Sequence, residues 1–353
     1  MEAGLQLHLP SYRDVPLKRL LQFAEMTHAA GVQQLWVTDN LQSRNAFVVL
    51  AALASALPIR LGTAVLVQYF RNPVDVADAA AAISELMDGR ELDLGISRGN
   101  PSTPGLMRSP KPVGLLRETA DALQLLLSGR PLKFAEYPTL ADYFNLQPNH
   151  EYRLNFLHER VGPVKLYCGG NAPRSLDVAG ASMDGIVYGW TFLGAARAGQ
   201  LGPLLSIADE RAHAAGRSAP LPRVAEIKLY VARDDTAARD ECRHATASRL
   251  PGLFDRGYSY DAFTSSGIAP ADLERLVTAF HRGASREELA SLITDAMVDT
   301  FFVAGDPARC REQLRQVTAL AEQHGFHQVM LSEISHDLEA GFRILCDEVL
   351  PSL

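Results

Sequence analysis

The stretch IRLGTAVLVQYFRNPVDVADAAAAISELMDGRELDLGISRGN, residues 59–100, has the pattern of a strand, a loop, a helix and a second strand. Apolar runs predict strands from Ile59 to Leu66 and from Glu91 to Ser97. Pro73 suits the first turn of the helix between them, which we expect from Val74 to Met87. Two parallel strands joined by a helix bring their carboxyl ends to the same rim, where β/α barrels carry their active sites.

Beyond this unit, strand and helix patterns alternate and predict eight β/α units in 353 residues. No GxGxxG motif follows the first strand, so a closed parallel barrel fits better than an open dinucleotide-binding sheet. We therefore predict a single (β/α)8 TIM-barrel domain over residues 1–353.

One long insertion, from Pro251 to Asp295, follows the seventh predicted strand, with helices near Pro270–Phe280 and Arg286–Ala296. Insertions after barrel strands gather at the carboxyl face, so we expect this one to be a lid that selects the substrate. A helical decoration packed away from the site is the alternative. Aromatic residues of the insertion suit the wall of an apolar pocket: Phe254, Tyr258, Tyr260 and Phe263.

Composition narrows the classes of partner. The net charge is -7 and the basic residues are scattered, which argues against nucleic acid or an anionic membrane surface. No apolar leader and no membrane-spanning run are visible, so we expect a cytoplasmic protein. The four cysteines lie far apart, and we expect neither a disulfide framework nor a metal site. They are Cys168, Cys242, Cys310 and Cys346.

Several motifs stand in an order typical of one family. GTAVL, NP, DGR and LGISRGN resemble the flavin-dependent luciferase-like oxidoreductases, and WVTDN and RNAF resemble the deazaflavin-dependent methylene-tetrahydromethanopterin reductase type among them. These oxidoreductases include bacterial luciferase, alkane monooxygenases and deazaflavin-dependent reductases. The resemblance covers most of the chain and implies a TIM barrel with its cofactor at the carboxyl rim.

For the activity, the resemblance implies first an FMN-dependent monooxygenase that uses O2 on a small organic substrate. A separate reductase would supply the reduced flavin, since no second nucleotide fingerprint is visible. One alternative is a hydride-transfer enzyme that uses the 8-hydroxy-5-deazaflavin coenzyme F-420. The other is a flavin-binding protein without turnover. The sequence does not name the substrate.

A glycine-rich turn, Gly169-Gly170-Asn171, joins a predicted strand to a helix. Glycines let backbone amides approach a phosphate, and a helix amino terminus favours an anion. A tight turn without a ligand has the same pattern. In the family the matching turn forms part of the cofactor phosphate site, together with the next strand, which ends here at Gly189 and Trp190.

Further cofactor contacts are expected at the two strand ends of the opening stretch. Arg98 and Asn100 follow the second strand, and a guanidinium binds phosphate bidentately. A salt bridge from Arg98 to Asp39 or Asp93 is the alternative. Ala64-Val65 matches the place where many family members have a cis peptide bond behind the flavin ring; an ordinary trans bond is the alternative.

The sequence offers more than one candidate for the acid–base residue. The family usually has an acid followed by histidine where this chain has Asp39-Asn40, and asparagine cannot shuttle a proton. Asp39, Asn40 and Tyr69 are our catalytic candidates. His8 and Tyr188 are further candidates, and each of them also suits a structural role.

Residues 46–57, AFVVLAALASAL, predict a helix that is apolar on nearly every side. A helix on the outside of a barrel should have one polar face. We therefore expect this helix to pack against a second copy of the chain, next to the alanine-rich helix that starts at Val74. Related enzymes pair in this way, so a homodimer is predicted.

Overall fold

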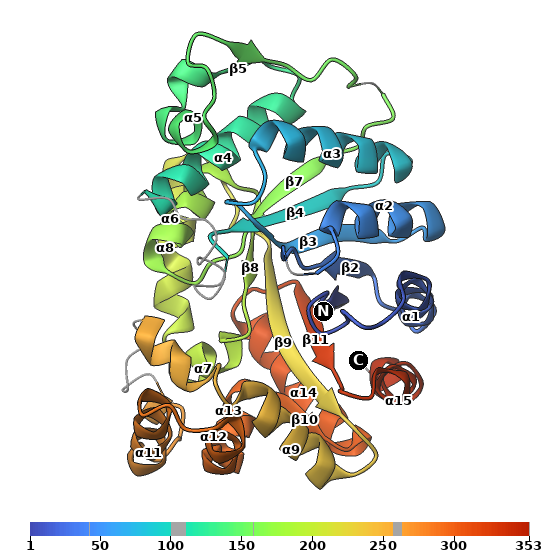
Figure 1. Cartoon of the computed structure of the whole chain (residues 1–353), viewed down its shortest axis with the longest axis vertical. Helices are drawn as coiled ribbons and strands as arrows, with labels where there is room; N and C mark the ends of the chain where they lie inside the picture. The colour runs from blue at the N-terminus through green and yellow to red at the C-terminus, as the bar shows by residue number, and fades with distance from the viewer. Residues whose placement is uncertain (42, 100–110, 158, 257–262, 353) are drawn as a thin grey trace.

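The structure is a computed structural model that describes the chain except residues 42, 100–110, 158, 257–262 and 353. Eight parallel strands form a closed barrel, since β8 pairs with β9 and β11 pairs with β1. Helices between the strands surround it (Figure 1). The strands are β1 (Glu2–Leu7), β2 (Gln34–Val37), β3 (Arg60–Val67), β4 (Leu92–Ser97), β7 (Val164–Cys168), β8 (Gly185–Tyr188), β9 (Arg223–Val231) and β11 (Gln328–Ile334). The predicted TIM barrel is confirmed.

The outer layer consists mainly of helices that follow the strands. They are α1 (Leu17–Ala29), α2 (Ala46–Ala56), α3 (Pro73–Leu86), α4 (Pro112–Leu127), α6 (Pro173–Ser182), α7 (Phe192–Arg197), α8 (Leu201–Ala214), α9 (Asp235–Thr246), α14 (Pro307–Gln323) and α15 (Leu338–Ile344). In the opening stretch, α3 begins at Pro73 and the side chain of Asn72 accepts a hydrogen bond from the Val74 amide. This cap satisfies one of the free amides of the first turn.

Large rings fill the middle of the barrel. Trp36 and Tyr167 meet edge to face, with ring centroids 5.8 Å apart. Gly62 and Gly185 make room for them: a Cβ on Gly62 would lie 2.7 Å from the Trp36 ring, and one on Gly185 2.2 Å from the Tyr167 ring. The barrel is therefore closed below these rings, and only its carboxyl end, called the mouth here, is left for a ligand.

The predicted insertion does follow the seventh barrel strand, β9. It contains α11 (Pro270–His281) and α12 (Arg286–Leu292), followed by α13 (Asp295–Phe301). The helix predicted from Arg286 to Ala296 is broken in two because the side chain of Thr294 accepts from the Met297 amide and starts α13. A short strand, β10 (Val303–Gly305), pairs with the end of β9 outside the closed ring. Tyr258 and Tyr260 lie outside the described residues.

The segment between α4 and β7 carries small elements without a clear sequence signal. They are β5 (Leu132–Lys133), α5 (Pro138–Phe144) and β6 (Glu151–Tyr152). Helix α2 buries Phe47, Leu50 and Leu53 against its own chain, while Val48 is 58% exposed. None of the described helices is long and apolar enough to span a membrane.

Candidate active site

A wall of the mouth is built around Val65 at the end of β3. The Ala64-Val65 peptide bond is cis, as the resemblance implies. Gln6 donates from Nε2 to the Ala64 carbonyl at 2.8 Å. The Val65 side chain fills the space above two glycines: a Cβ on Gly169 would lie 2.3 Å from Val65 Cγ1, and one on Gly95 3.1 Å from it. Gly169 therefore makes room for Val65, whereas a Cβ on Gly95 would first meet the Thr63 carbonyl oxygen, at 2.2 Å.

The side chain of Asn171 connects the glycine-rich turn to the end of β8 through two hydrogen bonds. Asn171 donates from Nδ2 to Thr191 Oγ1 at 2.7 Å and accepts at Oδ1 from the Gly189 amide at 3.3 Å. A Cβ on Gly189 would have no neighbour closer than 3.7 Å. A methyl group would therefore fit beside this turn in ordinary contact with Asn171 and Glu226. Trp190 stacks on Phe302 at 5.6 Å, next to the same strand end.

Arg98 lies exposed at the end of β4, close to the glycine-rich turn. Burial raises the pKa of the Cys168 thiol to about 12, and the charge of Arg98 opposes part of that rise. In the part of the chain that the structure describes, Arg98 forms a salt bridge with neither Asp39 nor Asp93. Asp39 pairs with Arg71, and Asp93 accepts a hydrogen bond from Gln34. The charge of Arg98 thus acts at the end of β7, where Cys168 lies. Asn100 lies outside the described residues.

Asp39 supports the wall from behind. Its amide donates to the Val65 carbonyl at 3.3 Å, and its Oδ2 pairs with Arg71 and accepts from the Val67 amide at 3.4 Å. The Asp39 side chain is fully buried. Its geometry suits positioning of the β3 end better than contact with a ligand. Asn40 follows half-buried.

Tyr69 is buried in the loop between β3 and α3. Its ring lies 5.8 Å from that of Tyr143, whose hydroxyl donates to the Tyr69 carbonyl at 3.3 Å. Tyr188 is packed on Phe192 and Phe326, on the outer face of β8. The structure therefore places Tyr188 away from the mouth.

A charged cluster lines the opposite side of the mouth. Lys228 on β9 donates from Nζ to Glu333 Oε1 on β11 at 2.7 Å, and Arg249 donates to the same oxygen at 2.8 Å. Burial alone would raise the pKa of Glu333, but Lys228, His8 and Arg249 hold it well below its ordinary value. Glu226 completes the cluster, with Oε1 3.6 Å from Lys228 Nζ.

His8 belongs to this cluster. Its Nδ1 lies 2.7 Å from Ser11 Oγ, and Ser11 donates to Glu333 Oε2 at 2.8 Å. Burial lowers the pKa of His8 to about 4, although the charge of Glu333 opposes that shift. His8 is therefore neutral at pH 7 and is unsuited to donate a proton there.

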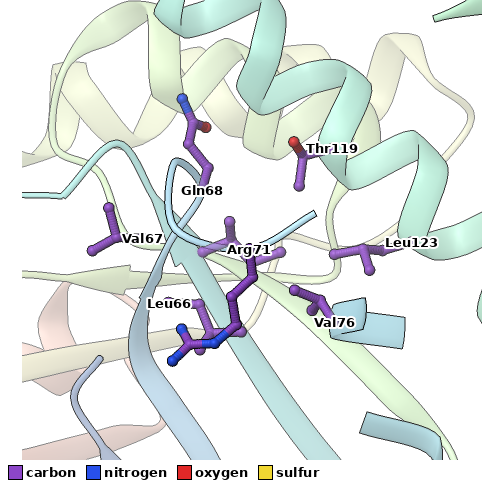
Figure 2. Close-up of a pocket in the computed structure, with 8 residues that line it drawn as sticks. Leu66, Val67, Gln68, Arg71, Val76, Thr119 and Leu123 are labelled. Atoms are coloured by element: carbon purple, nitrogen blue, oxygen red, sulfur yellow. The ribbon is translucent and has the colours of Figure 1, made fainter. Parts of the chain in front are cut away.

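A small cavity lies behind the wall, between the barrel and the helices α3 and α4. Figure 2 shows Gln68 and Thr119 on its border among apolar side chains. Gln68 Oε1 and Thr119 Oγ1 are buried and have no hydrogen-bond partner. Two such atoms at one cavity suit an ordered water better than a substrate. The lining residues are Leu66, Val67, Gln68, Arg71, Val76, Ile96, Thr119 and Leu123.

The family model described as luciferase-like monooxygenase matches residues 3–321. The chain belongs to this family. It is an oxidoreductase of the luciferase-like class, and its wall, glycine-rich turn and arginine stand at the mouth of the barrel that the family shares.

Three known proteins that resemble this chain differ in the activity for which they are named. A 5,10-methylenetetrahydromethanopterin reductase of Archaeoglobus fulgidus is 26% identical over 96% of this chain and 97% of its own. The structure of an F-420-dependent secondary alcohol dehydrogenase, with an F-420–acetone adduct, has a TM-score of 0.71 at 18% identity and covers 100% of this chain and 99% of that one. The oxygenating constituent of 3,6-diketocamphane monooxygenase from Pseudomonas putida, with FMN, has a TM-score of 0.65 at 16% identity and covers 99% and 98%.

The predicted residues of this luciferase-like chain fall into two groups. The structure brings Val65, Gly169, Asn171 and Gly189 together at the mouth, with Arg98 close by. Asp39 and Tyr69 lie behind the β3 end. The assigned roles remain predictions. Among the described residues, no group of three or more His, Cys, Asp or Glu could hold a metal ion.

Of the charged cluster, only His8 is among the residues predicted from the sequence. Glu226 and Lys228 stand two apart in the otherwise apolar strand AEIKLYVA, so both point to the same face. Two charges on one face of a strand expected to be buried were a usable signal, because buried charges are usually paired or functional. Their partner Glu333 is 105 positions from Lys228 in the chain.

Proposed function

We propose that this chain transfers hydride between the deazaflavin coenzyme F-420 and a small organic substrate. Support comes from the reductase of Archaeoglobus fulgidus, which is similar over nearly the whole of both chains. Two proteins named for F-420 dependence, from Mycobacterium tuberculosis and Microbacterium testaceum, are each 23% identical over at least 89% of this chain. This function now stands ahead of the FMN-dependent monooxygenase.

The observation that supports a flavin or deazaflavin ring is the wall at Val65, and the relatives named for F-420 dependence favour the deazaflavin. Gly95 and Gly169 lie next to Val65, and neither has room for a Cβ. Val65 is partly exposed, so a flat ring system can lie against it. We infer that the ring of the cofactor lies against Val65, and that Gly169, Gly170 and Asn171 with Arg98 hold its phosphate.

The cofactor would supply the hydride chemistry when bound. This chain would position it and shield it from water. Asp39 holds the end of β3 through the Val65 carbonyl and Val67 amide, while Trp36 and Tyr167 close the barrel beneath. Glu226, Lys228 and Glu333 form the facing side, where the substrate would lie.

We also propose that the insertion from Pro251 to Asp295 covers the mouth. Phe263 packs 5.1 Å from Phe301, and Phe301 packs 6.2 Å from Trp190 at the end of β8. Arg249, just before the insertion, binds Glu333 in the mouth. The insertion is thus anchored beside the open end of the barrel, which supports a lid.

The test is cofactor affinity, measured by fluorescence and absorbance titration with F-420 and with FMN. Gly189→Ala should fold normally, since its Cβ meets nothing closer than 3.7 Å, yet it should weaken binding at least several-fold because it occupies the ligand's space. Gly202→Ala on α8 is the matched control, because a Cβ there meets nothing within 4 Å. Equal affinity of both variants and the parent would contradict the proposed site.

An FMN-dependent monooxygenase is the second candidate. Arg98 favours it, because a single guanidinium beside the glycine-rich turn suits the terminal phosphate of FMN. Such an enzyme would depend on a separate reductase and would consume O2 with reduced FMN. Tight binding of FMN, no binding of F-420 and substrate-dependent O2 uptake would favour this candidate. Binding without turnover of any kind would identify a flavin-binding protein.

A further inference from the structure

One carboxylate oxygen of the mouth is open. Glu226 is held through Oε1, which accepts from Ser332 Oγ at 3.1 Å and lies 3.6 Å from Lys228 Nζ. No donor in the described part of the chain contacts Oε2, although the side chain is only 13% exposed. The protein therefore fixes this carboxylate and leaves one acceptor for something else.

The open oxygen lies near Gly189 at the end of β8, at the edge of the proposed cofactor site. Oε2 lies 3.7 Å from the position that a Cβ on Gly189 would take. In the closed barrel β9 is four strands from β3 in either direction, so Glu226 stands across the mouth from Val65. With the cofactor ring against Val65, Glu226 is on the side left for the substrate.

The charges around Glu226 are already balanced. Two cations, Lys228 and Arg249, face two carboxylates, Glu226 and Glu333, and both cations contact Glu333. No excess positive charge is left among these described groups to compensate a buried anionic group. A substrate phosphate, sulfonate or carboxylate here would face the open oxygen of Glu226.

His8 adds a second acceptor. Ser11 donates its only proton to Glu333 Oε2, so His8 Nδ1 must be the donor in its 2.7 Å contact with Ser11 Oγ. Neutral imidazole has one N–H, so Nε2 of His8 is an acceptor. No described group contacts that atom. Glu226 Oε2 and His8 Nε2 are therefore two hydrogen-bond acceptors on this side of the mouth.

We propose that Glu226 determines substrate specificity and that the enzyme takes a neutral or cationic substrate with an O–H or N–H donor, an alcohol or an amine. This inference rests on the proposed function for the position of the cofactor. Glu226 anchors the donor group of the substrate opposite the wall, and anions of similar size are rejected.

The experiment uses the full chain loaded with the cofactor it binds and four probes of one shape: cyclohexanol, cyclohexylamine, cyclohexanone and cyclohexanecarboxylate. Calorimetry and ligand-observed NMR give their affinities. We expect the alcohol and the amine to bind better than the ketone and the carboxylate. Glu226→Gln should weaken the two donors roughly 10- to 100-fold, the range for a hydrogen bond to a charged acceptor. Glu226→Asp should reduce the affinity for the alcohol and the amine by a smaller factor.

Glu226→Gln still offers an oxygen to Ser332, and Lys228 keeps Glu333, so the fold should persist; circular dichroism and melting check this. Glu210→Gln, the same change on the exposed surface of α8, is the control. The inference fails when donors and anions bind alike, when the preference survives in Glu226→Gln, or when no probe binds. When no cofactor binds but apoprotein shows the preference and Glu226→Gln loses it, the proposed function fails and this inference stands.

Discussion

Asp93 at the floor of the barrel allows a quantitative test of the structure. Its side chain is buried on β4, and Oδ2 accepts from Gln34 Nε2 at 2.6 Å. The other oxygen, Oδ1, is buried without a hydrogen-bond partner. Burial raises the pKa of Asp93 from 3.8 to about 7, and the Gln34 bond opposes part of that rise. The substitution to make is Asp93→Asn.

The magnitude follows from linkage. Each unit of pKa difference between the folded and unfolded chains is worth about 1.4 kcal/mol, so a pKa of about 7 against 3.8 costs about 4 kcal/mol above pH 7. The folded chain holds the proton more tightly, so the free energy of unfolding falls as pH rises from about 4 to about 7. The amide of the Asp93→Asn variant does not titrate, so this variant should gain up to about 4 kcal/mol over the parent at pH 8 and little at pH 4.

The assay is urea unfolding of the parent, Asp93→Asn and the exposed control Asp347→Asn at several pH values between 4 and 8. The difference in unfolding free energy between parent and Asp93→Asn should grow with pH and level off above 7. The control should show no such growth. A difference that is constant with pH would refute the reasoning, because it would show that Asp93 titrates alike in the folded and unfolded chains.

Three further predictions concern the site and the assembly. Arg98→Ala should weaken cofactor binding by roughly 1.5–3 kcal/mol and Arg98→Lys by less, if the guanidinium binds phosphate; unchanged titrations of both would reject that role. A dimer through α2 and α3 should sediment as such at micromolar concentration, and Val48→Lys should shift it to monomer, since Val48 is 58% exposed on α2; a monomeric parent would contradict this. A lid should be cut by protease near Ser265–Gly267 in apoprotein and protected by cofactor with a substrate mimic, whereas equal cleavage would leave the lid without support.

Local sequence signals predicted most of the fold. Apolar runs of strand length, the proline at the start of α3 and the glycine-rich turn all act within a few residues of each other, so they are visible along the chain. The order of β/α units then limits the topology, because parallel strands with helical crossovers close in few ways. The break between α12 and α13 was missed, since a single capping threonine decides it.

The sequence predicted only part of the candidate site. By itself the sequence determined the alternation of strands and helices, the family, and the glycine that leaves room for Val65. Tertiary structure alone decided that Asp39 pairs with Arg71 and that Lys228 and Glu333 meet across two barrel strands. It also decided that Glu226 keeps one oxygen open. The reason is physical: these side chains meet only when their strands pair side by side in the barrel, β2 with β3 and β9 with β11, although their positions are far apart in the chain.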